Sequence, residues 1–421
     1  MKRTLLTATS LSIAALASTA AAQDNTIQIG VPVFLSGAAA GPFGEPEKNA
    51  AELLFDTLNA GEVPAPYATP GINGRTIEAT YIDEATDAVL EYRNLVERSG
   101  VEAVIGYTSS GNCKSVAPVA EELETFTIFV DCGTPQIFEE VVVDPTYLFR
   151  TGPTATLDAV GSARYLVDME YDLGRVAGIN QNYAWGQDSW RDFTGTHRAL
   201  GAVCDFVSEQ FPQLGAGQYG AEVSALLTNT PDVVFSSFWG GDLEAFVLQG
   251  APRGLFARST VLMTCGEALF SSIASNIPDG SIITARGPYS VFAPESELAT
   301  WFSAAYVDRF GEQPPYPAWK MAQAILGAKA AYEAAGEDAN GADAAAAMKG
   351  LEFDSPAGMV RMVNGNGHQA IQGIGLGTYK FVDGEPTVEN VRFYEAECVN
   401  PPADMTAQAW IESGFTGAVC E

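Results

Sequence analysis

Histidines, basic residues and closely spaced cysteines are scarce in this chain of 421 residues. Two His (His197 and His368) and six Cys without a Cys-x-x-Cys pair leave little material for a zinc site or a histidine-based catalytic centre. Only 22 Lys and Arg stand against 52 Asp and Glu, and the formal net charge of −30 would repel nucleic acids and anionic membranes. We therefore expect no nucleic-acid partner, no metal and no other cofactor.

The length and the 47% apolar content are sufficient for two globular domains of ordinary size. At the N-terminus, Lys2 and Arg3 precede a short apolar segment and Ala20-Ala21-Ala22. This pattern predicts a secretory signal peptide over residues 1–22, cleaved near Ala22. A membrane anchor is the alternative, but the apolar segment falls short of the roughly 20 bulky residues that a span needs.

Export changes the interpretation of the cysteines, because thiols in an oxidising compartment usually form disulfides. Fifteen pairings of six cysteines are possible. We predict pairing in linear order, with residues 396–421 as a disulfide-linked C-terminal tail: Cys113 with Cys132, Cys204 with Cys265, and Cys398 with Cys420. A catalytic thiol at Cys113 is the competing interpretation, but no His lies near it in the sequence.

Apolar, β-rich runs alternate with helical patterns along most of the chain. This alternation predicts α/β architecture with parallel sheets covered on both faces. A single eight-stranded barrel is the alternative, but the helical residues 295–350 fit it poorly, so we predict two doubly wound sheets. The expected strands are residues 26–34, 76–82, 103–106, 126–130, 175–180, 202–207, 233–237, 260–264 and 281–285.

Ligands of open parallel sheets bind beyond the carboxyl ends of the strands, so the loops there hold the candidate site residues. Hydroxyls and backbone N–H groups in the first two loops suit a carboxylate, and the later loops bring aromatic rings and an acid. Each feature also has an ordinary structural explanation as a helix cap, turn or core residue. The candidates are Ser109, Ser110, Gly133, Thr134, Tyr183, Trp185, Phe238, Trp239 and Glu267.

Short segments along the whole mature chain together resemble one known family. They are Ile29-Gly30-Val31-Pro32, Leu35-Ser36-Gly37, Gly71-Ile72-Asn73-Gly74-Arg75, residues 106–111, Ala117-Pro118-Val119-Ala120-Glu121, Phe149-Arg150-Thr151, Tyr183-Ala184-Trp185-Gly186, Pro288-Tyr289, Tyr306, Arg309-Phe310-Gly311 and His368-Gln369. In order and spacing they resemble the type I periplasmic solute-binding proteins of ABC importers, in the branch of the leucine/isoleucine/valine-binding protein.

The resemblance implies two lobes joined by three crossovers, closing on a small solute. Lobe 1 would comprise residues 23–150 and 287–355, and lobe 2 residues 151–286 and 356–395, with crossovers near 150–153, 285–288 and 355–358. Ser109 and Ser110 resemble the loop that binds a ligand carboxylate, and Gly133 with Thr134 the second loop of that lobe. Tyr183 or Trp185 resembles the aromatic wall, and Glu267 the acceptor of a ligand ammonium; its structural alternative is stabilisation of a helix N-terminus.

The resemblance also implies a function: a monomeric, periplasmic protein that captures an amino acid, aromatic carboxylate or amide-like solute and delivers it to an ABC permease. Cysteines in two binding loops and the bulky Phe238-Trp239-Gly240-Gly241-Asp242 segment depart from the family pattern and leave the solute open. We expect no enzymatic activity. The alternatives are a sensory module for a membrane receptor and an exported enzyme that uses Glu267 with Asp242 as a carboxylate pair.

Overall fold

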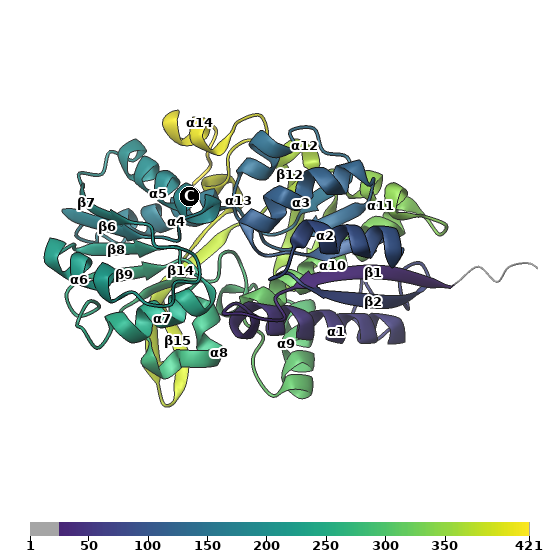
Figure 1. The fold of residues 1–421 in the computed structure, drawn as a ribbon, viewed down its shortest axis with the longest axis horizontal. Coiled ribbons are helices and arrows are strands. Elements are labelled where there is room, and N and C mark those ends of the chain that lie inside the picture. The colour runs from purple at the N-terminus through teal and green to yellow at the C-terminus, as the bar shows by residue number, and fades with distance from the viewer. Residues whose placement is uncertain (1–24, 421) are drawn as a thin grey trace, which may run out of the picture.

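The computed structural model describes residues 25–420, which form two α/β lobes, each built on its own sheet (Figure 1). The first sheet has eight strands in the order β11-β12-β13-β5-β4-β3-β1-β2, and the second has seven in the order β15-β14-β10-β9-β8-β6-β7. Strands β1 to β5 pair in parallel, as do β6 to β10. The prediction of two doubly wound sheets is confirmed. The predicted signal peptide over residues 1–22 lies outside the described residues.

Among the described residues, the first lobe has seven α-helices around its sheet. Its strands are β1 (Thr26–Val33), β2 (Thr76–Asp83), β3 (Ala103–Gly106), β4 (Phe126–Phe129), β5 (Leu148–Arg150), β11 (Glu352–Ser355), β12 (Gly358–Val363) and β13 (Gln369–Ile371). Its helices are α1 (Glu45–Ala60), α2 (Ala88–Arg93), α3 (Ser110–Glu122), α9 (Glu297–Phe310), α10 (Tyr316–Ala335), α11 (Gly341–Met348) and α12 (Asn364–Gly367).

The second lobe is built in the same way. Its strands are β6 (Arg175–Ile179), β7 (Asp205–Gln210), β8 (Val233–Ser236), β9 (Thr260–Met263), β10 (Ile282–Thr284), β14 (Ile374–Val382) and β15 (Glu385–Tyr394). Its helices are α4 (Ala155–Asp168), α5 (Ala184–Ala199), α6 (Gly220–Asn229), α7 (Gly240–Gly250), α8 (Phe270–Ile273), α13 (Ala396–Val399) and α14 (Ala407–Glu412).

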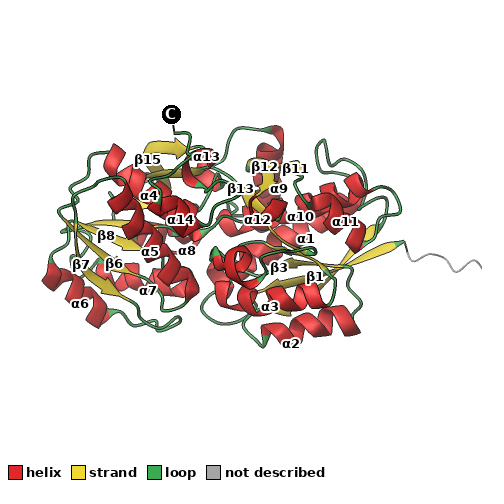
Figure 2. Ribbon diagram, turned by 90° about the horizontal axis from the view of Figure 1, so that it is seen from above, coloured by secondary structure: helices red, strands yellow, loops and turns green. Residues whose placement is uncertain are grey.

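Helices cover both faces of each sheet (Figure 2), which explains the continuous apolar runs of the central strands. In the first lobe, Leu54 of α1 and Ile325 of α10 pack in one core cluster, whereas Tyr92 of α2 and Val116 of α3 pack in another. Strands β3, β4 and β8 are buried along their whole length. Because both faces are covered, the polar loops at the strand ends are the parts of the sheets left to meet a ligand.

The chain passes between the sheets three times. The first two passages follow β5 and β10, as predicted. The predicted third passage at residues 355–358 is wrong, because these residues form the turn of the antiparallel β11–β12 hairpin within the first sheet. Strand β13 still belongs to that sheet, since Gln369 pairs with Arg150 of β5. The chain crosses at residues 372–373, so the first lobe extends to Ile371.

Two of the three predicted disulfides are present, Cys113–Cys132 and Cys398–Cys420. The predicted Cys204–Cys265 pair is wrong, and both thiols are free. Cys204 lies just before β7, at the amino edge of the sheet, whereas Cys265 follows β9 at the carboxyl edge, with β8 and β6 between the two strands. Opposite edges of a sheet cannot be joined by one S–S bond.

The C-terminal segment from residue 396 packs on the second lobe, where α13 contacts α4 and α14 contacts α5. It also reaches the first lobe, because the Ala407 N–H donates to Glu139 Oε1 over 2.7 Å. None of the helices in residues 25–420 combines the length and apolar character required to cross a bilayer.

Candidate functional site

The carboxyl ends of the two sheets face each other across two neighbouring cavities that share Trp239. The inner cavity has a free volume of about 10 Å³ and is lined by Phe43, Thr108, Ser110, Asp131, Gly133, Tyr183, Trp185, Trp239, Cys265, Arg286 and Tyr316. The outer cavity has about 460 Å³ and is lined by Phe34, Ser36, Gly37, Ala38, Ala39, Glu84, Ala85, Thr86, Ser109, Asn112, Leu214, Gly215, Trp239, Gly240, Gly241 and Asp242. Both cavities take lining residues from both lobes.

The loop after β3, predicted to bind a carboxylate, already holds one from the protein itself. The backbone N–H groups of Thr108 and Ser109 donate to the two carboxylate oxygens of Glu84 over 2.9 and 2.7 Å. Ser110 remains at the inner cavity, where its Oγ accepts the Thr134 N–H over 3.2 Å. Its hydroxyl proton has no acceptor among the described residues, so Ser110 is the member of this loop free to donate to a solute.

An aromatic wall closes the inner cavity from the side of the second lobe. Trp185 Nε1 donates to the Ser237 carbonyl over 2.7 Å, and Trp239 Nε1 donates to the Tyr183 hydroxyl over 2.8 Å. The Trp239 ring reaches across to the first lobe, with its centroid 5.0 Å from that of Phe43. A Cβ atom at Gly133 would overlap the Trp185 ring, so only glycine permits this approach.

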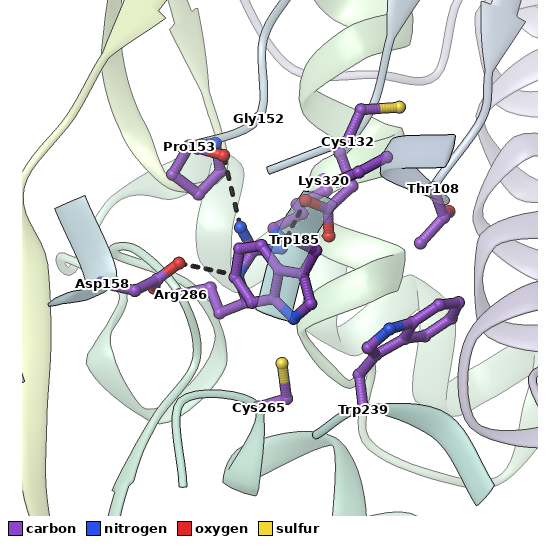
Figure 3. A network of polar contacts seen from close by, with 12 residues as sticks. Thr108, Cys132, Gly152, Pro153, Asp158, Trp185, Trp239, Cys265, Arg286 and Lys320 are labelled. Carbon is purple, nitrogen blue, oxygen red and sulfur yellow. Dashed lines mark hydrogen bonds and ion pairs between the residues drawn. The ribbon is translucent and has the colours of Figure 1, made fainter. Parts of the chain in front are cut away.

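A buried cluster of four charges lies beside this wall (Figure 3) and was not predicted from the sequence. Lys320 Nζ lies 2.7 Å from Asp131 Oδ2, and Arg286 Nε lies 2.9 Å from Asp158 Oδ2. Arg286 Nη1 bonds Asp131 as well, so this residue of the second crossover joins a carboxylate of each lobe. All four side chains are at most 4% exposed. Arg286 also stacks on Trp185, with 4.1 Å between its Cζ and the ring centroid.

The pKa values of the cluster follow from burial and pairing. Burial favours the neutral form of Asp131, but Arg286 and Lys320 outweigh it and lower the pKa of this carboxyl. Burial lowers the pKa of Lys320 to about 8, and burial raises the pKa of Asp158 to about 6. Asp131 is thus held in its charged form by its two cations, Arg286 and Lys320.

The sequence contains a weak signal for this cluster. Asp131 and Arg286 each stand two residues after a buried strand, Asp131 in a predicted site loop and Arg286 in the predicted second crossover. Arg286 is unusual there because basic residues are so scarce in the chain. Lys320 lies inside the apolar helix α10, and no local pattern distinguishes it from a surface lysine.

The other predicted site residues lie elsewhere. Ser109 lines the outer cavity. Thr134 Oγ1 donates to Asp188 Oδ2 of α5 over 2.6 Å and so holds the lobes together. Phe238 is a core residue between Tyr219 and Phe246. Glu267 accepts the Tyr316 N–H at the start of α10 over 2.9 Å and lines a separate cavity, which matches its structural alternative as a helix-end acid.

Comparison with known families identifies this architecture. The model of a family described as periplasmic binding protein matches residues 26–385. The chain belongs to the periplasmic binding protein family. No curated protein sequence matches this periplasmic binding protein at a significant level.

Many solved structures share the fold of this periplasmic binding protein. A solute-binding protein of an ABC transporter from Rhodopseudomonas palustris, in complex with 3,4-dihydroxybenzoic acid, is 22% identical with a TM-score of 0.77, and the match covers 90% of this chain and 100% of that one. The branched-chain amino acid binding protein of Streptococcus pneumoniae, in complex with isoleucine, is 18% identical with a TM-score of 0.73, covering 88% and 99%.

Proposed function

We propose that this protein captures a small aromatic carboxylate between its lobes and delivers it to an ABC permease. The observation that carries the proposal is Arg286, a buried cation that lines the inner cavity and stacks on its aromatic wall. A guanidinium has five N–H donors. Asp131, Asp158 and the Pro153 carbonyl take three of them, and the other two have no acceptor among the described residues.

An aromatic acid suits the cavity better than an amino acid. An ammonium group needs a free acceptor, but Asp131 is bonded by two cations, and Glu267 lines another cavity. A carboxylate instead meets Arg286 and the Ser110 hydroxyl, and an aromatic ring meets Trp185 and Trp239. Solved relatives in complex with 3,4-dihydroxybenzoic acid, benzoate and 4-hydroxybenzoate support an aromatic acid as the solute. The relative in complex with isoleucine represents the amino acid alternative.

Capture requires the lobes to separate, since an inner cavity of about 10 Å³ is far smaller than a benzene ring. The three crossovers are the hinge, and the aromatic wall moves with the second lobe while Ser110 stays with the first. Solute bound in the open form is then buried as the lobes close, and the permease recognises the closed form.

Simple binding is favoured over the enzymatic alternative, because Glu267 and Asp242 line different cavities and cannot act on one substrate atom. Recovery of incubated solute unchanged is the expected result. A receptor as partner, in place of a permease, predicts signalling without solute uptake in cells that carry the protein. For the periplasmic location we propose cleavage after Ala22, so N-terminal sequencing of the exported protein should begin at Gln23.

Titration calorimetry with benzoate and leucine tests the proposed solute class. Benzoate should bind, and leucine should bind at least about tenfold more weakly because its ammonium finds no free acceptor. Ser110→Ala should weaken benzoate binding about 3- to 10-fold, the value of one hydrogen bond, while the matched Ser109→Ala should change it little. Tighter binding of leucine, or equal effects of the two serine variants, would contradict the proposal.

A further inference from the structure

A third cavity lies between the first crossover, α12 and the segment that joins α13 to α14. These three helices lie along the upper side of the molecule in Figure 1. We call the cavity the hinge groove; its volume is about 330 Å³. Arg150 and Thr154 line it from the first crossover, residues 364–366 line it from α12, and residues 403–407 line it from the C-terminal segment. It shares no lining residue with the inner or outer cavity.

Arg150 is a buried cation with no carboxylate at ion-pair distance, although Asp131, Glu139 and Asp188 lie near enough to act on its charge. Its residue is 1% exposed, and it forms no ion pair with any carboxylate among residues 25–420. Its Nε donates to Gln369 Oε1 and its Nη1 donates to the carbonyl oxygens of Cys132 and Thr134, which are all neutral acceptors. Nη2 has no acceptor in the described structure. An anion in the groove would give this buried charge the direct partner that it lacks.

The opposite wall of the groove also favours an anion. Thr154 is the N-cap of the 14-residue helix α4, and its Oγ1 accepts the Leu157 N–H over 3.4 Å. The Thr154 hydroxyl proton is therefore left to donate, and the positive end of the α4 dipole lies beside it. Glu139, which accepts the Ala407 N–H, and Asp404 also line the groove; they weaken the binding of any anion, and of a multiply charged one most.

We infer that the hinge groove is a second binding site, for a small monoanionic carboxylate held between Arg150 Nη2 and the Thr154 hydroxyl. Arg150 ends β5 of the first lobe and Thr154 precedes α4 of the second, so the two donors stand on opposite ends of the first crossover. An anion that bonds both favours one orientation of the lobes and is thereby coupled to the solute cleft. The site is distinct from the proposed aromatic-acid site and does not depend on it.

Titration of the full mature protein with trifluoroacetate, followed by ¹⁹F NMR, tests the inference. Wild type should show saturable binding, and Arg150→Gln should bind one trifluoroacetate fewer. Arg253→Gln removes an exposed arginine of the second lobe and should match wild type. Unchanged stoichiometry in Arg150→Gln would overturn the site.

A second variant keeps the test decisive if Arg150→Gln does not fold. Glu139→Gln retains an acceptor for Ala407 N–H but removes the negative charge from the groove. Trifluoroacetate should then bind about fivefold more tightly, because the repulsion between the two carboxylates is gone. Affinity equal to or weaker than that of wild type would overturn the inference.

Discussion

At the scale of single residues, Asp131 organises the charged groups beside the inner cavity. It is 2% exposed and accepts both Lys320 and Arg286, and Arg286 in turn bonds Asp158 of the other lobe. Buried ion pairs contribute little net stability when complete, but they are costly to break because the remaining partner stays buried and unpaired. The cluster therefore positions Arg286 toward the cavity more than it stabilises the fold.

Asp131→Asn should lower the free energy of unfolding by about 3–5 kcal/mol, since two buried cations lose their shared anion. Urea denaturation at constant salt measures this loss. The matched control is Asp56→Asn, which breaks the exposed ion pair with Arg309 and should cost about 0–1 kcal/mol. Equal losses of unfolding free energy in the two variants would show that Asp131 contributes no more to stability than an exposed ion pair does.

The sequence predicted part of the cleft at this scale. The structure places five of the residues predicted from the strand-end loops on the inner cavity: Ser110, Gly133, Tyr183, Trp185 and Trp239. Phe238 was not distinguishable from Trp239, because local sequence does not show which of two adjacent aromatic rings points into the core. The ion pairs of the buried cluster could not be predicted either, because the two partners of each pair lie more than 100 residues apart in the sequence.

At the scale of elements, helix α10 begins without a cap of its own. Its N-cap is Pro315, which has no side-chain hydrogen bond to offer, and the N–H of Tyr316 instead donates to Glu267 from the second lobe. Burial raises the pKa of Glu267 to about 7. Folding thus favours the protonated carboxyl, and this contribution to stability is lost as the pH rises from the unfolded value of about 4.3 through 7.

Glu267→Gln replaces the carboxyl with an amide that does not ionise, so the variant should not lose this stability as the pH rises. The difference in unfolding free energy, variant minus wild type, should be larger at pH 8 than at pH 5 by about 1–3 kcal/mol. Urea denaturation at the two pH values measures it, with the exposed Glu412→Gln as the control expected to show no such change. A difference that is constant with pH would mean that Glu267 does not titrate with folding.

The elements themselves were largely predictable, because buried parallel strands and their helices have distinct hydrophobic patterns. The strand predicted at 202–207 is displaced toward the C-terminus as β7, an edge strand with only partial burial and hence a weak pattern. The third crossover was misplaced for a different reason. The β11–β12 hairpin joins the first sheet only through long-range pairing of Gln369 with Arg150, which no local pattern encodes.

At the scale of the whole molecule, direct contacts hold the lobes together. Asp188 of α5 accepts Thr134 Oγ1 over 2.6 Å and Gln136 Nε2 over 3.0 Å, both from the first lobe. The Gly241 N–H donates to the Ala38 carbonyl over 2.9 Å on the other side of the cleft. These bonds exist only while the lobes are closed, so they shift the balance between open and closed forms.

Asp188→Ala should open the solute-free protein and raise its radius of gyration in small-angle X-ray scattering. Benzoate affinity should fall about fivefold, because closure costs more free energy. Asp168→Asn alters a carboxylate that bonds only within the second lobe and serves as the control. An unchanged radius of gyration would mean that other contacts dominate closure.

The free thiol of Cys265 gives the cleft a built-in chemical reporter. It lines the inner cavity between the lobes, and burial raises its pKa to about 11. Alkylating reagents can therefore reach and attack it only when the lobes separate. Its labelling rate measures how often the empty protein opens, and a trapped solute slows that rate. The same burial shields the Cys265 thiol from oxidants in solution as long as the lobes are closed.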